Sequence, residues 1–177
     1  MTESEGRFFD GVQRQTIAAA MARIIPTDHE AGAAEAGTID FLDRYLSGIG
    51  YVFAKPDGSG FETLTGKRAE AWQQRIEIIR RKYLDGIDEL NQRSRAEFGG
   101  DFARLTPDQQ DLILSAMEAR TPLDDRGQEA EQGVSGFSPP EPGLQQIKAE
   151  ADLDFFPLLV LHTRQGFLAD PVYGGNK

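Results

Sequence analysis

The last residues of the chain, 155–177, read FFPLLVLHTRQGFLADPVYGGNK, and this stretch decides how the rest of the sequence is interpreted. It begins with a dense apolar run that is long enough for about three turns of helix. It then changes character, because Asp170-Pro171 and Gly174-Gly175 predict turns: proline restricts the residue before it, and glycine allows positive φ. The sequence therefore predicts a buried helix followed by an extended tail at residues 166–177, held against its own domain or against another chain.

Two aromatic residues in this tail, Phe167 and Tyr173, favour a role in binding. They supply rigid apolar area on either side of the Asp170-Pro171 turn, and Asn176 follows them near the end of the chain. Aromatic anchors on a preorganised segment lose little conformational entropy when they dock. We therefore expect the tail to make the main contact with a partner. The alternative is that its aromatic residues cover the core of the chain's own domain.

Composition limits the classes of function that remain. A chain of 177 residues is large enough to form one globular domain with a sizeable core. Its net charge of −10 repels phosphate, so nucleic acid and anionic membrane surfaces are not expected as partners. The sequence contains no cysteine, which excludes disulfides, thiolate metal sites, iron–sulfur clusters and a cysteine nucleophile.

No membrane span and no export signal are predicted. No stretch approaches the ~20 apolar residues that a membrane-spanning helix needs. The first residues, MTESEGRF, have neither the basic region nor the apolar region of a signal peptide. This favours a cytoplasmic location. The alternative is a periplasmic location, if the chain is a mature form or is exported together with a partner.

Apolar residues recur at helical spacing along much of the chain. The pattern predicts helices at residues 8–25, 38–47, 65–95 and 106–120, and another that leads into the terminal stretch. The third of these would be about 45 Å long. It carries a row of apolar residues close to a heptad repeat, which indicates a core-facing seam: Trp72, Ile76, Ile79, Tyr83, Ile87 and Leu90. Its internal Gly86 is expected to weaken it by about 1 kcal/mol.

Several residues predict where helices begin and end. Pro26 ends the first helix, because it disfavours the α conformation of Ile25. Thr38 is expected to be the N-cap of the second helix. Thr106 and Gln109 form a capping box around Pro107, which predicts a helix start at that point.

The remaining segments are interpreted as loops of one all-α domain that spans residues 1–177. Residues 51–64 contain a Pro-Asp-Gly turn and predict a surface loop. Residues 121–143 are rich in proline, glycine and acidic residues and predict a second surface loop. No strand pattern, repeat or domain boundary is present in the sequence.

Candidate catalytic residues are scarce. His29 has no second ligand at helical spacing and is interpreted as a solvated loop histidine, and His162 as a hydrogen-bonded, semi-buried one. The sequence has no nucleophile-elbow, dinucleotide-binding or P-loop motif. One basic cluster, Arg75 with residues 80–82, favours the wet face of a helix, with contact to an acidic partner surface as the alternative. No catalytic, cofactor-binding or metal-binding residue is therefore assigned to this chain.

Three blocks of sequence resemble the gluconate 2-dehydrogenase subunit 3 family. The first runs IIPTD at residues 24–28, continues through Gly32 and AEAG at 34–37, and ends with IDFL at 39–42. The second comprises Phe98 to Phe102, Leu105 and PDQQ at 107–110. The third is the C-terminal pattern GF at 166–167, DP at 170–171 and YGGN at 173–176. The blocks occur in the family's order and cover most of the chain.

The resemblance implies a role in an oxidoreductase complex. Members of the family are the small, cofactor-free partner of an FAD-dependent catalytic subunit of the glucose–methanol–choline type, which oxidises sugars or polyols. A cytochrome c subunit often carries the electrons onward. The small subunit is expected to act in a chaperone-like way, aiding the folding, stability and export of the flavoprotein within a hetero-oligomer.

Two hypotheses follow from these observations. In the first, the chain is a non-catalytic subunit that binds and stabilises the flavoprotein of a sugar dehydrogenase complex, and FAD is held by the partner. Its expected contacts lie in the loop after the first helix and in the tail: Pro26, Thr27, Asp28, Gly32, Gly37, Phe167, Asp170, Pro171, Tyr173, Gly174, Gly175 and Asn176. In the second, it is a free-standing helical binding or stress-type protein without a flavoprotein partner.

Overall fold

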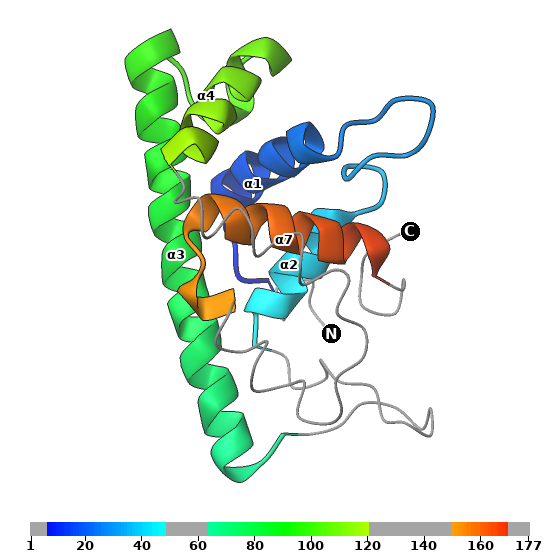
Figure 1. The fold of residues 1–177 in the computed structure, drawn as a ribbon, viewed down its shortest axis with the longest axis vertical. Coiled ribbons are helices and arrows are strands. Elements are labelled where there is room, and N and C mark those ends of the chain that lie inside the picture. Colours follow the sequence, from blue (N-terminus) through cyan, green and yellow to red (C-terminus); the bar gives the residue numbers. More distant parts are fainter. Residues whose placement is uncertain (1–6, 49–63, 121–149, 170–177) are drawn as a thin grey trace.

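The computed structural model describes residues 7–48, 64–120 and 150–169, and within these residues the fold is all-α (Figure 1). The elements, in order, are α1 (Gly11–Ile24), α2 (Thr38–Leu46), α3 (Gly66–Phe98), the 3₁₀ helix η1 (Phe102–Arg104), α4 (Pro107–Arg120) and α7 (Phe155–Leu168). No strand occurs in this part of the chain, and the predicted fold class is confirmed. None of the described helices is long and apolar enough to cross a membrane.

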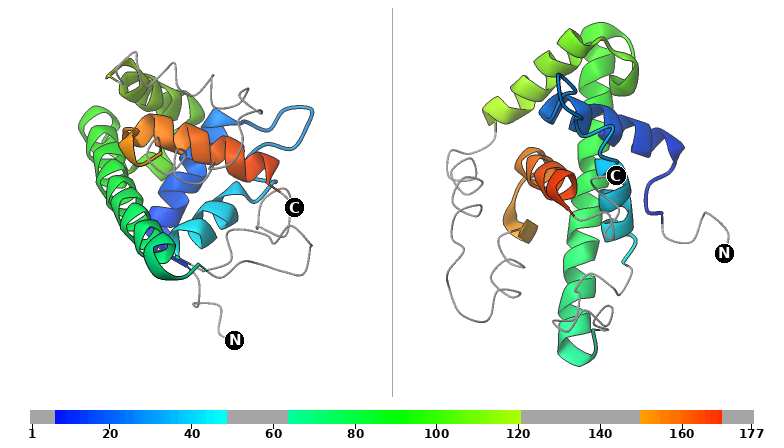
Figure 2. Two further views of the ribbon diagram at one scale, coloured as in Figure 1. Left: turned by 60° about the horizontal axis from the view of Figure 1, so that its bottom comes forward. Right: turned by 90° about the vertical axis from the view of Figure 1, so that its right-hand side faces the viewer.

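The long helix α3 organises the molecule. It has 33 residues, and the shorter helices pack against it (Figures 1 and 2). Every residue of the predicted apolar seam is buried, from Trp72 to Leu90. The core they help to form also contains Ile17 and Met21 of α1 and residues from α2, α4 and α7. The described helices therefore share one hydrophobic core.

Gly86, in the middle of α3, has a packing role that the sequence did not reveal. A Cβ atom built at this position would lie 2.2 Å from the ring of Phe155, which is closer than any real contact. The ring of Phe155 also packs edge-on against Tyr83, with ring centroids 5.6 Å apart. Because Gly86 has no side chain, Phe155, the first residue of α7, can pack directly against α3.

Capping residues determine where α1 and α4 begin and where α3 ends. The side chain of Asp10 accepts hydrogen bonds from the backbone of Val12 and Gln13, so α1 begins at Gly11 and not at Phe8. Gly99 ends α3 with φ of 77°. The predicted capping box before α4 is confirmed, because the backbone amide of Thr106 donates to Gln109 Oε1 at 3.0 Å.

The predicted N-cap of α2 is wrong. Gly37, with φ of 67°, occupies the N-cap position, and Thr38 is the first residue of the helix. The Thr38 side chain is buried, and its hydroxyl has no hydrogen-bond partner among the described residues. A left-handed conformation favours glycine, and it lets the loop turn directly into α2.

The expected extended tail begins later than the sequence suggested. Gly166 and Phe167 belong to α7, which continues to Leu168. A Cβ atom at Gly166 would lie 2.9 Å from Phe41 Cδ1 and 2.9 Å from Thr38 Cγ2, so the glycine lets α7 pack closely on α2 instead of breaking the helix. Residues 170–177 of the tail lie outside the described residues, as do the predicted loop at 121–143 and all but the last residue of the loop at 51–64.

Candidate functional site

The loop between α1 and α2 projects from the body of the molecule (Figure 1). Its base is closed by a hydrogen bond from the Ala33 amide to the Ile25 carbonyl, at 2.9 Å. Its outer part, residues 26–31, is exposed. The predicted contact residues Pro26, Thr27 and Asp28 all lie in this exposed part.

One carboxylate fixes the shape of this loop. Glu35 Oε2 accepts hydrogen bonds from the Thr27 hydroxyl at 2.6 Å and from the Gly32 amide at 3.1 Å. The hydrogen bond from Thr27 is the main reason that the pKa of Glu35 is lowered from its ordinary value. Gly32 is required by close packing, because a Cβ atom there would lie 2.6 Å from the backbone nitrogen of Thr27. The loop is therefore preorganised, which is a property of binding loops.

The structure divides the predicted contact residues into two kinds. The side chains of Pro26, Thr27 and Asp28 are exposed to solvent. Gly32 and Gly37 instead determine the backbone conformation of the loop, Gly32 by close packing and Gly37 by its positive φ. Phe167 is half-buried in the last turns of α7, and the tail residues from Asp170 to Asn176 lie outside the described part of the chain. Their contact with a partner stays a prediction.

His29, in the same loop, is exposed as predicted. No group of three or more potential metal ligands occurs in residues 7–48, 64–120 and 150–169.

The second histidine, His162, lies in a buried polar network. Its side chain is 0% exposed, with Nδ1 2.8 Å from the Tyr83 hydroxyl and Nε2 2.8 Å from Glu150 Oε1. A carboxylate can only accept a hydrogen bond, so Nε2 carries the proton and Nδ1 accepts from Tyr83. The prediction of a hydrogen-bonded histidine is confirmed, although its burial is complete and not partial.

Two more side chains complete this network. The other oxygen of Glu150, Oε2, accepts from the Tyr45 hydroxyl at 3.0 Å and forms an ion pair with Arg75. Arg75 also donates to the Tyr45 hydroxyl at 2.9 Å and lies 5.1 Å from the centre of the Trp72 ring. The network thus connects α2, α3 and α7 with Glu150, a residue that precedes α7.

Burial sets the protonation states in the network. It lowers the pKa of His162 to about 3, and the positive charge of Arg75 acts in the same direction. Burial raises the pKa of Tyr45 to about 12 and raises that of Tyr83 as well. His162 is therefore neutral and enclosed by its partners, so it cannot reach a substrate as a catalytic base would.

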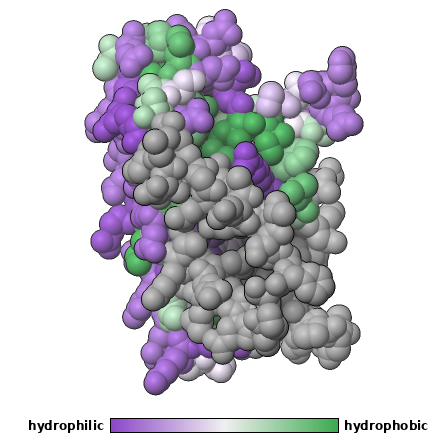
Figure 3. Space-filling model, in the orientation of Figure 1, coloured by the Kyte–Doolittle hydropathy of each residue, from purple (hydrophilic) through white to green (hydrophobic). Residues whose placement is uncertain are grey.

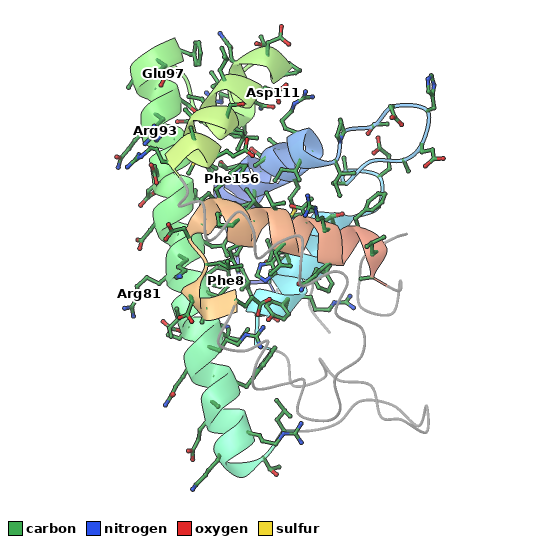
Figure 4. All side chains as sticks on the ribbon, viewed as in Figure 1. Phe8, Arg81, Arg93, Glu97, Asp111 and Phe156 are labelled. Carbon is green, nitrogen blue, oxygen red and sulfur yellow. The ribbon has the colours of Figure 1, made fainter. Side chains whose placement is uncertain are left out.

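Three of the four residues in the basic cluster on α3 serve the fold, so the interpretation of the cluster as the wet face of a helix holds for Arg81 alone. Besides Arg75, Arg80 donates to the carbonyl oxygen of Leu46 at 2.6 Å, at the end of α2. Lys82 donates to the carbonyl oxygens of Ala151 at 2.7 Å and Leu153 at 2.5 Å. Carbonyl groups at helix ends need donors, and α3 supplies them. Of the four basic residues, Arg81 alone is exposed, and it points away from the packed helices (Figure 4).

Sequence reasoning missed most of this network. The polar His162 within an apolar run was a signal of a buried hydrogen bond, but nothing in the sequence identified Glu150 or Tyr45 as its neighbours. These residues are 12 and 117 positions from His162 along the chain, and only the packing of α2 and α7 on α3 brings them together.

Comparison with known proteins agrees with the sequence blocks. The family model described as gluconate 2-dehydrogenase subunit 3 matches residues 12–177. The match includes the projecting loop and α7. Comparisons with curated proteins and with solved structures gave no match.

Proposed function

Because the chain belongs to the gluconate 2-dehydrogenase subunit 3 family, we propose that it is the non-catalytic small subunit of an FAD-dependent sugar dehydrogenase complex. It binds the flavoprotein catalytic subunit, of the glucose–methanol–choline type, and stabilises it. The family match over residues 12–177 carries this proposal. Substrate oxidation and FAD belong to the partner, and this chain contributes a binding surface.

The described side chains support a role without catalysis. His162 and Glu150 bind each other and are held by Tyr83, Tyr45 and Arg75, so their polar atoms are already used within the fold. A catalytic acid or base needs access to the reacting group. The network fits a structural function, in which it joins α7 to α2 and α3.

The projecting loop at residues 26–37 supports a role in binding. It combines exposed side chains with a backbone fixed by Glu35, Gly32 and Gly37. A loop that is rigid before binding loses less conformational entropy when a partner covers it. Exposed side chains on a rigid backbone are expected of a surface that docks on another subunit.

Co-expression of the tagged chain with the candidate flavoprotein subunit tests the proposal. We expect the two to purify together in a fixed ratio, with flavin absorbance in the complex and none in the chain purified alone. The flavoprotein should also melt at a lower temperature without the small subunit. Haem absorbance in the same preparation would indicate that the complex also contains a cytochrome c subunit. A flavoprotein that folds, binds FAD and shows no association with this chain would contradict the proposal and favour a free-standing binding protein.

A further inference from the structure

One face of α7 packs along one face of α2 (Figures 1 and 2). On α2 this face includes Thr38, Phe41 and Tyr45, whose spacing places them on the same side of a helix. The centre of the Tyr45 ring lies 5.2 Å from that of His162. About one turn further along α7, Gly166 lies against Thr38 and Phe41. The contact with α7 therefore extends to the first residue of α2.

Gly166 packs so closely that α7 and the first turn of α2 cannot move independently. A Cβ atom at this position would lie 2.9 Å from Thr38 Cγ2 and 2.9 Å from Phe41 Cδ1. Thr38 is 0% exposed, and its side chain is branched at Cβ and therefore stiff. The ring of Phe41 moves only as one rigid group. A displacement of the end of α7 is thus passed on to Thr38.

Thr38 is also the residue at which the projecting loop ends. Its amide donates to the carbonyl oxygen of Ala33 at 3.1 Å, and the Ala33 amide donates to the carbonyl oxygen of Ile25 at 2.9 Å. Ile25 is the C-cap of α1, so these two hydrogen bonds join the end of α1 to the start of α2 across the base of the loop. The residue that closes one side of this base is therefore the residue that packs on α7.

The exposed part of the loop depends on this base. Residues 26–31 stand away from the helices as a hydrophilic projection (Figure 3). The buried residues of the loop, Gly32, Ala33 and Ala36, lie at its base. A segment with few buried contacts opens locally at low free energy, so the projection keeps its shape only while its base is held.

We propose that α7 controls the projecting loop: the packing of Gly166 on Thr38 and Phe41 holds the loop in the shape that meets the partner. The proposal rests on the proposed function for the identity of that partner, the flavoprotein subunit. Because α7 follows the other described helices along the chain, the loop reaches this shape only after the C-terminal helix has packed. Molecules in which α7 is displaced bind the partner more weakly, because fewer of them have the loop in its binding shape.

Hydrogen exchange in the free chain tests this control. Gly166→Ala places a methyl group against α2, and we expect exchange at the amides of Ala33 and Thr38 to become faster by about fivefold or more. Gly86→Ala is the matched control, because it is the same substitution in a helix and its methyl group meets Phe155 at the other end of α7. We expect it to leave the exchange of both amides unchanged.

A second pair of variants decides the question if Gly166→Ala does not fold. Coupling between two sites is reciprocal, so a loosened loop must also loosen the end of α7. Glu35→Ala removes the carboxylate that holds Thr27 and Gly32, and Glu30→Ala makes the same charge change at an exposed position in the loop. We expect exchange at the Gly166 amide to become faster by about fivefold or more in Glu35→Ala and to stay unchanged in Glu30→Ala.

Three exchange results would overturn the proposal. Equal acceleration in Gly166→Ala and Gly86→Ala would mean that the loop follows overall stability. Unchanged exchange in Gly166→Ala would mean that the loop is held by its own hydrogen bonds. Unchanged exchange at the Gly166 amide in Glu35→Ala would mean that the loop and α7 are not coupled.

Binding is measured separately from exchange. Gly166→Ala should bind the flavoprotein about fivefold or more weakly than Gly86→Ala, because the added methyl group displaces the contact in every molecule. Equal binding by the two variants, with a loosened loop in the first, also overturns the proposal. If the unsubstituted chain does not bind the flavoprotein, the proposed function fails, and the exchange results still decide whether α7 controls the loop.

Discussion

At the scale of single residues, His162 shows how burial makes stability depend on pH. Its pKa is about 3 in the folded chain against an ordinary value of 6.5, because burial and the charge of Arg75 oppose protonation. Glu150 and Tyr83 hold its two nitrogens, and Tyr45 lies behind Glu150. Below pH 6.5 the unfolded chain takes up a proton at this residue and the folded chain does not. The stability contributed by neutral His162 is therefore fully present above pH 6.5, the pKa of histidine in the unfolded chain. It is lost as the pH falls from 6.5 towards about 3, the pKa in the folded chain.

The first prediction follows from this difference. Between pH 7 and pH 5 the free energy of unfolding should fall by about 2 kcal/mol on account of His162. Denaturant unfolding at several pH values measures it, with His162→Gln as the control because glutamine can donate and accept but does not titrate. The advantage of the unsubstituted chain over the variant should shrink as the pH falls. A constant difference between the two would contradict the pKa assignment.

A second prediction concerns Gly86, where helix propensity and packing act in opposite directions. Glycine to alanine in a helix interior normally stabilises by about 1 kcal/mol. At Gly86 the new methyl group would overlap the Phe155 ring, so Gly86→Ala should instead destabilise by about 1–3 kcal/mol. Gly11→Ala is the control, because a Cβ atom at Gly11 meets nothing within 4 Å. Chemical denaturation of both variants decides it, and equal stability in both would show that Phe155 moves away without cost.

At the scale of elements, the sequence predicted most helices because their signals are local. Pro26 and the Thr106 capping box act within a few residues, and the seam of α3 is a simple spacing. The errors occurred where a distant contact decides the outcome. Thr38 looked like a cap, but the turn is made by Gly37, and Gly166 looked like a helix end, but it lies against Phe41. For the same reason the sequence could predict a loop between α1 and α2, and it could not predict the buried network.

The projecting loop gives a third prediction. Glu35 holds Thr27 and Gly32 by hydrogen bonds to one carboxylate oxygen, so Glu35→Ala should loosen the loop without affecting the core. Glu30→Ala makes the same charge change at an exposed position in the same loop. Hydrogen exchange at the Gly32 amide should become faster in Glu35→Ala and stay unchanged in Glu30→Ala. Equal exchange in both variants would mean that the backbone alone holds the loop.

A fourth prediction concerns the contact between the N-terminal segment and α2. Asp43 is 2% exposed and accepts hydrogen bonds from the amides of Phe8 at 2.7 Å and Phe9 at 3.0 Å. Asp43 also pairs with Arg14, which forms a second ion pair with Asp40. Asp43→Ala leaves buried donors without an acceptor and should cost about 2–3 kcal/mol. Asp40→Ala removes a more exposed partner of the same arginine and should cost less than about 1 kcal/mol. Thermal or denaturant unfolding compares the two, and similar losses would contradict the assigned role of Asp43.

At the scale of the whole molecule, buried charges link the parts of the chain. Arg75 comes from α3, and Glu150 precedes α7. Tyr45 of α2 binds both, and His162 of α7 binds Glu150. Because this network is buried in the core, it fits a structural role, which is to fix how α2, α3 and α7 pack against one another. Hydrophobic contacts alone specify such an arrangement less strictly, and a role in specificity is the hypothesis to test here.

The last prediction tests that hypothesis with a double-mutant cycle. Glu150→Gln leaves the guanidinium of Arg75 buried without its counter-ion, and Arg75→Met leaves the carboxylate buried beside a neutral histidine. Each single change should cost about 3–5 kcal/mol of folding free energy. The double variant, Arg75→Met with Glu150→Gln, removes both charges and should be more stable than the sum of the single losses predicts. Equilibrium unfolding of the four proteins gives the coupling energy, and additivity within about 0.5 kcal/mol would show that the pair does not act as a unit. The binding to a flavoprotein that we propose should be kept in the double variant, because the network is enclosed and its function lies in the fold.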